Sequence, residues 1–369
     1  MTEGGQLEKE GTRKAIRPVL IVSRHNISEQ AAWVRRLLLG LADESISTAL
    51  VCPPDCEVGQ IAPVPDDLFT HPLAELPLME HMGIEALAEQ LAKFKPTVLH
   101  CLCESRAGLV RRLARRLDVP YVLSINGLAR KLSRLSISSR RCTSIVVPAQ
   151  TIRSAVAQAG LAPVERIRPI NIGTFVESEP VCFSDPSRLS SLVVVHPLER
   201  AADFAGLLKA TQRLMAAGHE FMMVIMGSGR AEHQLRLLLA EYALADVVTI
   251  VPPLEPRRSV LATADIFIQP QPTPTFNVTI LEAMGLGAAV AACAGGVDDL
   301  IVPNQTALVF EKNDEHSIRE CLTRLLEDHA YAHRLAGAAQ TYVAGRYSVG
   351  QMIAAMLETY NDAPQQYHD

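Results

Sequence analysis

Short apolar runs alternate with amphipathic segments along almost the whole of this 369-residue chain. The runs have the length of buried strands, and the segments between them repeat apolar residues every three or four positions, as helices that cover a sheet do. This alternation is typical of parallel α/β domains. Because a single hydrophobic core stops growing at about 250–300 residues, the chain is long enough to form two such domains.

The N-terminal half predicts a first set of strands and helices around a long loop. Strands are expected at Val19–Ser23, Thr48–Cys52, Val98–Leu102, Tyr121–Ile125, Ser144–Pro148 and Arg166–Ile170. Helices are expected at Glu29–Asp43, Ile84–Phe94, Ala107–Leu117 and Ile152–Ala159. Residues 53–80 are rich in proline and lack periodicity, which indicates an irregular loop or insertion.

The C-terminal half repeats the alternation. Strands are expected at Leu192–His196, Phe221–Met226, Val247–Val251, Ile266–Gln269, Ala288–Ala292 and Leu308–Phe310. Helices are expected at Ala205–Ala217, Glu232–Tyr242, Ser259–Ala264, Phe276–Met284, Glu315–Glu327, His333–Val343 and Val349–Tyr360. Between the halves, Val176–Leu189 is rich in acids, serine and proline, a composition typical of a linker.

The predicted fold is therefore α/β, with two tandem Rossmann-like domains facing each other across a cleft. We expect a disordered tail at residues 1–17, a first domain at 18–176, a linker at 177–189, a second domain at 190–345 and a C-terminal helix at 346–369. Ligands of such sheets bind beyond the carboxyl ends of the strands, which places the site in the cleft.

Composition and charge exclude several classes of protein. The net charge of −5 gives no sign of a nucleic-acid partner, and no stretch reaches the about 18 apolar residues of a membrane-spanning helix. The N-terminus is too charged for a secretory signal and the eight cysteines lack C-x-x-C spacing, so we expect a cytoplasmic protein with reduced cysteines and no metal site. Two basic stretches, Arg106–Arg116 and Lys131–Arg141, are either solvated faces or contacts with an anionic acceptor or a membrane surface.

The segment Pro270–Gly296, PQPTPTFNVTILEAMGLGAAVAACAGG, is the most informative about function. It predicts a loop, a helix, a strand and a glycine turn, and the first N–H groups of that helix, around Asn277 and Val278, are available to an anion. Glu282 lies two turns into the helix, where the helix dipole no longer favours an acid. The first predicted strand is followed by SRHNISEQ without a glycine fingerprint, so we expect neither NAD nor FAD, and no bound cofactor.

This segment resembles the donor-sugar motif of family-4 glycosyltransferases, E-S-F-G-x-x-x-L-E-A-M-A-x-G-x-P-V-V-A-S-x-x-G-G. Further strings resemble that family in the same order, among them MVIMGSGRAEHQL, ATADIFIQPQ, CAGGVDDLI and RIRPINIGTF. The resemblance implies a GT-B fold, with an acceptor-side domain first and a nucleotide-sugar domain second, and a last helix that crosses back onto the first domain. It also implies transfer of a sugar from a UDP- or GDP-type donor with retention of configuration.

Carried over by position, the resemblance assigns a donor site to the second domain. Glu282 takes the place of the second motif glutamate, which bonds the ribose hydroxyls in the family, while the first falls on Pro274. The family's phosphate-binding arginine and lysine fall on Pro197 and Ala202, which leaves other cations nearby as candidates. The donor-binding candidates are Glu282, Asn277, Val278, Gly227, Gly229, Arg200, Arg230, Gly295 and Gly296.

On the acceptor side, Asn126 takes the place of a motif histidine, and His25 and His100 lie at predicted strand ends toward the cleft. Each candidate also has a plain structural interpretation: the glycines form turns, the histidines pack in the interior, and Glu282 pairs with an arginine without a ligand. Two functions therefore stay open. One is a glycosyltransferase acting on an unknown glycan, lipid or small molecule, with peripheral membrane contact as an option. The other is a catalytically inactive binding or scaffold protein on the same fold, and a related epimerase-like hydrolase is disfavoured.

Overall fold

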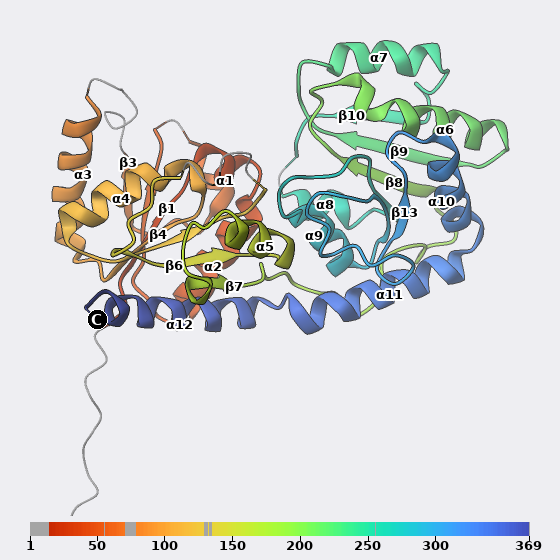
Figure 1. The fold of residues 1–369 in the computed structure, drawn as a ribbon. Coiled ribbons are helices and arrows are strands. Elements are labelled where there is room, and N and C mark those ends of the chain that lie inside the picture. The colour runs from red at the N-terminus through yellow and green to blue at the C-terminus, as the bar shows by residue number, and fades with distance from the viewer. Residues whose placement is uncertain are drawn as a thin grey trace, which may run out of the picture.

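The computed structural model describes residues 15–54, 56–70, 79–128, 132, 135–254 and 256–368, and it forms two parallel sheets, one in each half of the chain (Figure 1). The first sheet has the strand order β3-β2-β1-β4-β5-β6-β7, and the second has the order β10-β9-β8-β11-β12-β13. All of the pairings between these strands are parallel, and they confirm the predicted pair of α/β domains.

The first sheet contains β1 (Pro18–Ile21), β2 (Ala49–Cys52), β3 (Asp67–Thr70), β4 (Val98–Cys101), β5 (Tyr121–Ser124), β6 (Cys142–Val147) and β7 (Ile167–Pro169). The helices of this half are α1 (Arg24–Ser28), α2 (Ala31–Asp43), α3 (Glu80–Phe94), α4 (Ala107–Leu117) and α5 (Gln150–Gln158). Short 3₁₀ turns occur at Val58–Ile61, Glu104–Arg106 and Val164–Arg166.

The second sheet contains β8 (Ser190–Val195), β9 (Phe221–Met226), β10 (Val248–Val251), β11 (Ile266–Gln269), β12 (Ala289–Cys293) and β13 (Leu308–Phe310). Its helices are α6 (Ala205–Ala216), α7 (Glu232–Glu241), α8 (Arg257–Leu261), α9 (Val278–Leu286), α10 (Glu315–Glu327) and α11 (His329–Arg346), with a 3₁₀ turn at Ala201–Phe204. The final helix is α12 (Val349–His368).

One strand and one α-helix were not expected from the sequence. The stretch 53–80, expected to be irregular, contains the edge strand β3, whose residues are mostly exposed and therefore show no apolar pattern. The SRHNISEQ segment contains the short helix α1, which begins with a capping box between Ser23 and Asn26. Residues 71–78, most of the tail expected at 1–17, and part of the basic stretch Lys131–Arg141 lie outside the described residues.

Helix α9 is buried on almost every side, with only Thr279 partly exposed among its nine residues. The apolar core around the first sheet continues into α9 and onto α11 and α12, while a second apolar cluster fills the other face of the second sheet. A helix that is apolar all round must be covered from all directions, so α9 is held between the second sheet and the first domain.

Helices α11 and α12 run along one side of both domains, so the chain ends on the domain in which it began (Figure 1). On α12, the Tyr360 hydroxyl lies 2.6 Å from Nδ1 of His100, and Asp362 pairs with Arg168 at 2.7 Å. No helix among the described residues is long and apolar enough to cross a bilayer.

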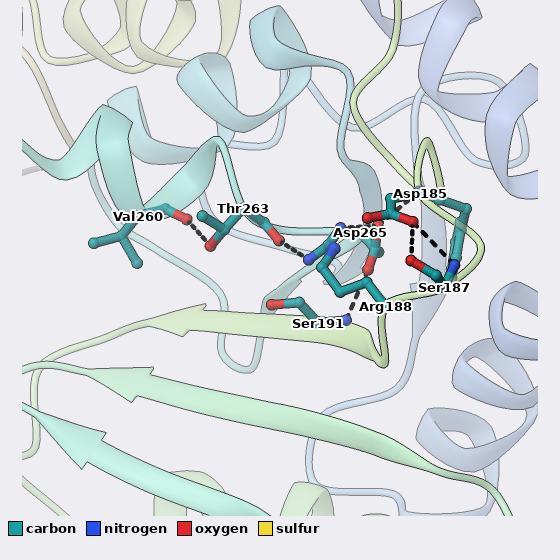
Figure 2. A network of polar contacts seen from close by, with 8 residues as sticks. Asp185, Ser187, Arg188, Ser191, Val260, Thr263 and Asp265 are labelled. Carbon is teal, nitrogen blue, oxygen red and sulfur yellow. Dashed lines mark hydrogen bonds and ion pairs between the residues drawn. The ribbon is translucent and has the colours of Figure 1, made fainter.

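The segment that joins the domains is bound to the second sheet through Asp265, the residue before β11 (Figure 2). The carboxylate of Asp265 accepts hydrogen bonds from the backbone N–H groups of Phe183 at 2.6 Å and Ser191 at 2.7 Å, and it pairs with Arg188 at 2.8 Å. Only 3% of the Asp265 side chain is exposed. This buried carboxylate therefore fixes residues 183–191 against the second domain.

Candidate functional site

A cavity of about 290 Å³ lies between the two domains, at the carboxyl ends of strands from the second sheet. The first domain contributes His25, Glu29 and Gln30, from α1 and the turn that follows it. The ends of β8, β9 and β11 with the loops after them, Pro253 after β10, Arg257 of α8 and the start of α9 contribute the rest, most of which are small or uncharged. The cavity lies where an α/β sheet presents its ligand site.

The N-terminus of α9 opens into this cavity. Asn277 caps the helix: its Oδ1 accepts from the Ile280 N–H at 3.0 Å, and its Nδ2 donates to Gln269 at 2.8 Å. Val278 and Thr279 line the cavity, and their N–H groups have no hydrogen-bond partner among the described residues. Unpaired N–H groups in the first turn of a helix attract anions, and the predicted positions Asn277 and Val278 lie at this helix start, beside the cavity.

Gly227 lies at the point where the loops after β8 and β9 touch. A side chain there would place its Cβ atom 2.2 Å from the backbone oxygen of His196, so only glycine fits. The neighbouring Gly229 packs on the Leu198 backbone in the same way and lies outside the cavity wall, whereas Gly227 and Ser228 line it. Of this glycine pair, the structure therefore brings Gly227 to the cavity.

Gly295 and Gly296 form a turn behind the cavity rather than part of its lining. Gly296 has a φ of 75°, and a Cβ atom on it would lie 2.1 Å from the Thr273 backbone oxygen. The same oxygen accepts a hydrogen bond from the Val297 N–H at 2.8 Å. The two glycines thus support the 272–275 loop, which itself lines the cavity.

The cations that the sequence suggested for the diphosphate are not at the cavity. Arg200 pairs with Asp203 at 2.7 Å, three residues along the chain, and Arg230 is 80% exposed and 3.5 Å from Glu199. Neither lines the cavity, although Pro197 does. In this conformation neither Arg200 nor Arg230 takes the place of the missing cations, because each guanidinium group pairs with a nearby carboxylate outside the cavity.

Glu282 forms a buried ion pair with Arg36 of α2, in the first domain. Both side chains are 3% exposed, and Arg36 also donates to the Gly173 backbone oxygen at 3.1 Å. Burial lowers the pKa of Arg36, and the adjacent Glu282 carboxylate opposes that shift. The cavity beside Glu282 measures only about 20 Å³, which is room for about one water molecule. In this conformation Glu282 joins the two domains, and a ribose does not fit against it.

The acceptor-side candidates separate into three environments. His25 lies on α1 rather than at a strand end, and it lines the cavity. Asn126 is buried and donates to the Leu102 backbone oxygen at 2.8 Å. His100 does not face the cleft at all, because it lies beneath α12 between Tyr360 and Ser124. The expectation of a cleft histidine at position 100 is therefore wrong. The complete burial of His100 also lowers its pKa to about 3.

A backbone contact across the cleft was not foreseen from the sequence. Gly127, after β5, forms an antiparallel bridge with Thr275, and the Leu128 N–H donates to the Pro274 backbone oxygen at 2.6 Å. The Phe276 N–H donates to the Asn126 backbone oxygen at 2.9 Å. Pro274, which takes the place of the first motif glutamate, therefore contributes its carbonyl to a contact between the domains.

Two further cavity residues were not recognised from the sequence. His196 lines the cavity at the end of β8, where burial lowers its pKa more than Asp203 raises it, so its imidazole is neutral at pH 7. Arg257, the first residue of α8, lines the cavity and donates to the Ser28 backbone oxygen at 2.7 Å. The Pro-Arg-Arg sequence after β10 was the available signal for Arg257, because proline favours the start of a helix. Among the described residues there is no group of three ligand-type side chains placed to hold a metal ion.

Two protein families match the sequence of this chain. The family described as "Glycosyl transferases group 1" matches residues 186–342, and "Glycosyltransferase Family 4" matches residues 30–174. The chain belongs to glycosyltransferase family 4. The two matched ranges of this family-4 protein cover one half of the chain each, and they confirm the family that the motifs indicated.

The curated relatives of this family-4 protein align with only part of its length. It is 30% identical over 166 residues to the GDP-mannose-dependent monoacylated alpha-(1-6)-phosphatidylinositol monomannoside mannosyltransferase of Corynebacterium glutamicum, covering 42% of this chain and 43% of the relative. It is 25% identical over 267 residues to the sulfoquinovosyl transferase of Arabidopsis thaliana, covering 65% and 51%. The chain thus spans about half the length of these relatives.

Solved structures match over nearly the whole chain. A glycosyltransferase from Rickettsia africae superposes with a TM-score of 0.78 at 13% identity, covering 94% of this chain and 98% of that one. Anabaena HepE, solved in complex with UDP and glucose, superposes with a TM-score of 0.77 at 14% identity, covering 93% and 99%. At these identities the matches concern the fold, which is the two-domain GT-B arrangement.

Proposed function

We propose that this family-4 protein transfers a sugar from a nucleotide-diphosphate donor to an acceptor, with retention of configuration, and that the donor diphosphate binds at the N-terminus of α9. The observation that carries the proposal is the pair of N–H groups of Val278 and Thr279, which line the interdomain cavity without a partner among the described residues. In a cavity shielded from water, such fixed donors stabilise the negative charge of a departing diphosphate.

The donor is either a GDP-type or a UDP-type nucleotide sugar. The Corynebacterium glutamicum relative is named as dependent on GDP-mannose, and HepE has been solved with UDP and glucose. The acceptor is a glycan, a lipid or a small molecule. The cavity of about 290 Å³ lies near the lower limit of small-molecule sites, which is about 300 Å³. We therefore expect the two domains to move apart as a nucleotide sugar enters and to come together again on its diphosphate.

A single backbone N–H group can be removed to test the site. Val278 is the first residue of α9, where proline is tolerated, and the preceding Asn277 is already extended, with φ −90° and ψ 93°. Val278→Pro should therefore preserve the helix while it removes one phosphate donor. Val278→Ala keeps the N–H group and serves as the matched control for the lost side chain.

The measurement is calorimetric titration with UDP and GDP, followed by detection of the released nucleoside diphosphate with the matching nucleotide sugars. Val278→Pro should bind the diphosphate about tenfold more weakly than Val278→Ala, because a hydrogen bond to a charged group contributes about 1.5–3 kcal/mol. Equal affinities in the two variants contradict the assignment of α9. The anomeric configuration of the product, read by NMR, tests retention.

A second function is favoured by a separate observation. The positions where the family carries its first glutamate and its two cations hold Pro274, Pro197 and Ala202 here, and neither Arg200 nor Arg230 replaces them at the cavity. A non-catalytic binding or scaffold protein has no need for those charges. This alternative predicts no release of nucleoside diphosphate from any nucleotide sugar, with or without candidate acceptors, and measurable release eliminates it.

A further inference from the structure

The diphosphate of a nucleotide sugar carries negative charge that the N–H groups of α9 offset only in part, since a helix N-terminus is equivalent to about half an elementary charge. The two cations suggested by the sequence lie outside the cavity. Among the described residues that line it, Arg257 is the only arginine or lysine. Any arginine or lysine side chain that meets a phosphate in this conformation therefore comes from α8, not from the loop after β8.

Arg257 stands at the junction of two cavities. It lines the larger cavity of about 290 Å³ and also the adjoining space of about 20 Å³ beside Glu282. Val278 and Thr279 line both cavities as well. Arg257 and the first turn of α9 thus line the same two cavities, and helices α8 and α9 pack against each other.

The guanidinium group of Arg257 is held in a fixed orientation. It donates to the Ser28 backbone oxygen at 2.7 Å and the Glu29 backbone oxygen at 3.3 Å, at the C-terminal end of α1, and it lies 3.3 Å from Oε2 of Glu29. Carbonyls at the end of a helix attract cations. Only 13% of the Arg257 side chain is exposed, so the charge is already oriented and largely withdrawn from water.

We propose that Arg257 is the phosphate-binding cation of this protein, and that it contacts the donor diphosphate beside the N–H groups of Val278 and Thr279. The inference rests on the proposed function of the cleft. It assigns a binding residue to α8 that the family motif does not place there. Since the anchoring carbonyls belong to the first domain, the guanidinium reaches this position only when the two domains are together.

The test compares nucleoside and nucleoside diphosphate binding. Calorimetric titrations with uridine and UDP, and with guanosine and GDP, are run on the full chain and on Arg257→Gln. The substitution should weaken diphosphate binding about ten- to a hundredfold, as expected for the loss of a charge-assisted hydrogen bond, and should leave nucleoside binding within about twofold. Arg257→Lys should restore part of the loss because it keeps the charge.

Two matched controls come from the same surfaces. Arg258→Gln removes the next arginine of α8, which lines only the small cavity and pairs with Glu177 at 2.7 Å. Arg230→Gln removes the exposed arginine favoured by the sequence. Both variants should bind the diphosphate within about twofold of the parent, since neither guanidinium lines the large cavity.

Glu29→Gln separates phosphate binding from a purely structural link between the domains. If Arg257 binds phosphate, removal of the neighbouring carboxylate takes one negative charge from the cavity wall, so diphosphate affinity stays equal or rises. If Arg257 only links the domains, Glu29→Gln and Arg257→Gln both weaken binding of nucleoside and diphosphate alike, and the inference is overturned. Unchanged diphosphate binding in Arg257→Gln also overturns it. If the parent protein binds no nucleoside diphosphate, the proposed function itself fails, and this inference fails with it.

Discussion

The buried ion pair between Arg36 and Glu282 should be a large contributor to stability that depends on both partners. Arg36 belongs to α2 and Glu282 to α9, so the pair joins the two domains. We consider Glu282→Gln, Arg36→Met and the double variant. Each single change leaves the remaining charged group buried at 3% exposure with its main partner gone.

The expected magnitude follows from that burial. Removing one partner of a buried ion pair costs about 3–5 kcal/mol, because the other charge is left without compensation. In Glu282→Gln, Arg36 keeps its bond to the Gly173 backbone oxygen, so we place this substitution near the lower limit, at about 3 kcal/mol, and we take the same figure as the minimum for Arg36→Met. In the double variant neither charge is left without compensation, so the combined loss should be no more than that of one single substitution, about 3 kcal/mol, which is a coupling energy of about 3 kcal/mol.

The assay is urea-induced unfolding followed by the fluorescence of Trp33, the only tryptophan in the sequence. Trp33 is 2% exposed and lies on α2 three residues before Arg36, so its emission reports on the helix that carries the arginine. Glu232→Gln is the matched control. It breaks the exposed pair with Arg236 on α7, four residues along the same helix, and should cost less than about 0.5 kcal/mol.

The reasoning is refuted if Glu282→Gln destabilises the protein no more than Glu232→Gln does. The same variant also tests the role that the family motif implies for Glu282. If the carboxylate bonds a ribose in an open conformation, Glu282→Gln weakens nucleotide binding by at least about 1 kcal/mol. If it serves only the pair with Arg36, stability falls and nucleotide affinity in the folded protein does not.

Three further outcomes follow from the packing. Asp265→Ala removes the acceptor for two backbone N–H groups and the partner of an arginine, so the free energy of unfolding should fall by about 3 kcal/mol. The fall should be smaller in Asp265→Asn, and equal losses in the two variants contradict this reasoning. Burial lowers the pKa of His100 to about 3, below the unfolded value of about 6.5, so the unfolded state binds the extra proton and stability is lost as pH falls from 6.5 toward 3. Urea midpoints at pH 7 and pH 5 should therefore differ less in His100→Gln than in the parent. Gly296→Ala and Gly295→Ala both force a side chain onto a left-handed backbone, which costs about 1–2 kcal/mol of stability. Only the new side chain of Gly296→Ala also meets the Thr273 backbone oxygen, so thermal unfolding should show the larger loss of stability in that variant.

Much of the fold can be predicted from local sequence pattern, because each buried strand and each amphipathic helix is encoded within its own residues. Strand β9 at Phe221–Met226, helix α4 at Ala107–Leu117 and helix α10 at Glu315–Glu327 have the bounds that the pattern predicts. The edge strand β3 was missed because it is exposed and therefore carries no apolar signature. The domain boundaries themselves stay predictions.

Less of the candidate site than of the fold could be predicted from the sequence. Sequence alone indicated the family, the α9 N-terminus and the glycines that shape the nearby loops, since motif spacing and backbone chemistry are local properties. Only the tertiary structure decided that Arg36 pairs with Glu282 and that His100 lies under α12. It also decided that Arg257, rather than Arg200 or Arg230, reaches the cavity. Arg36 and Glu282 are 246 residues apart in the chain, and Arg257 meets its anchors at Ser28 and Glu29 from the opposite domain. Charge placement of this kind depends on how two domains pack, which no local pattern encodes.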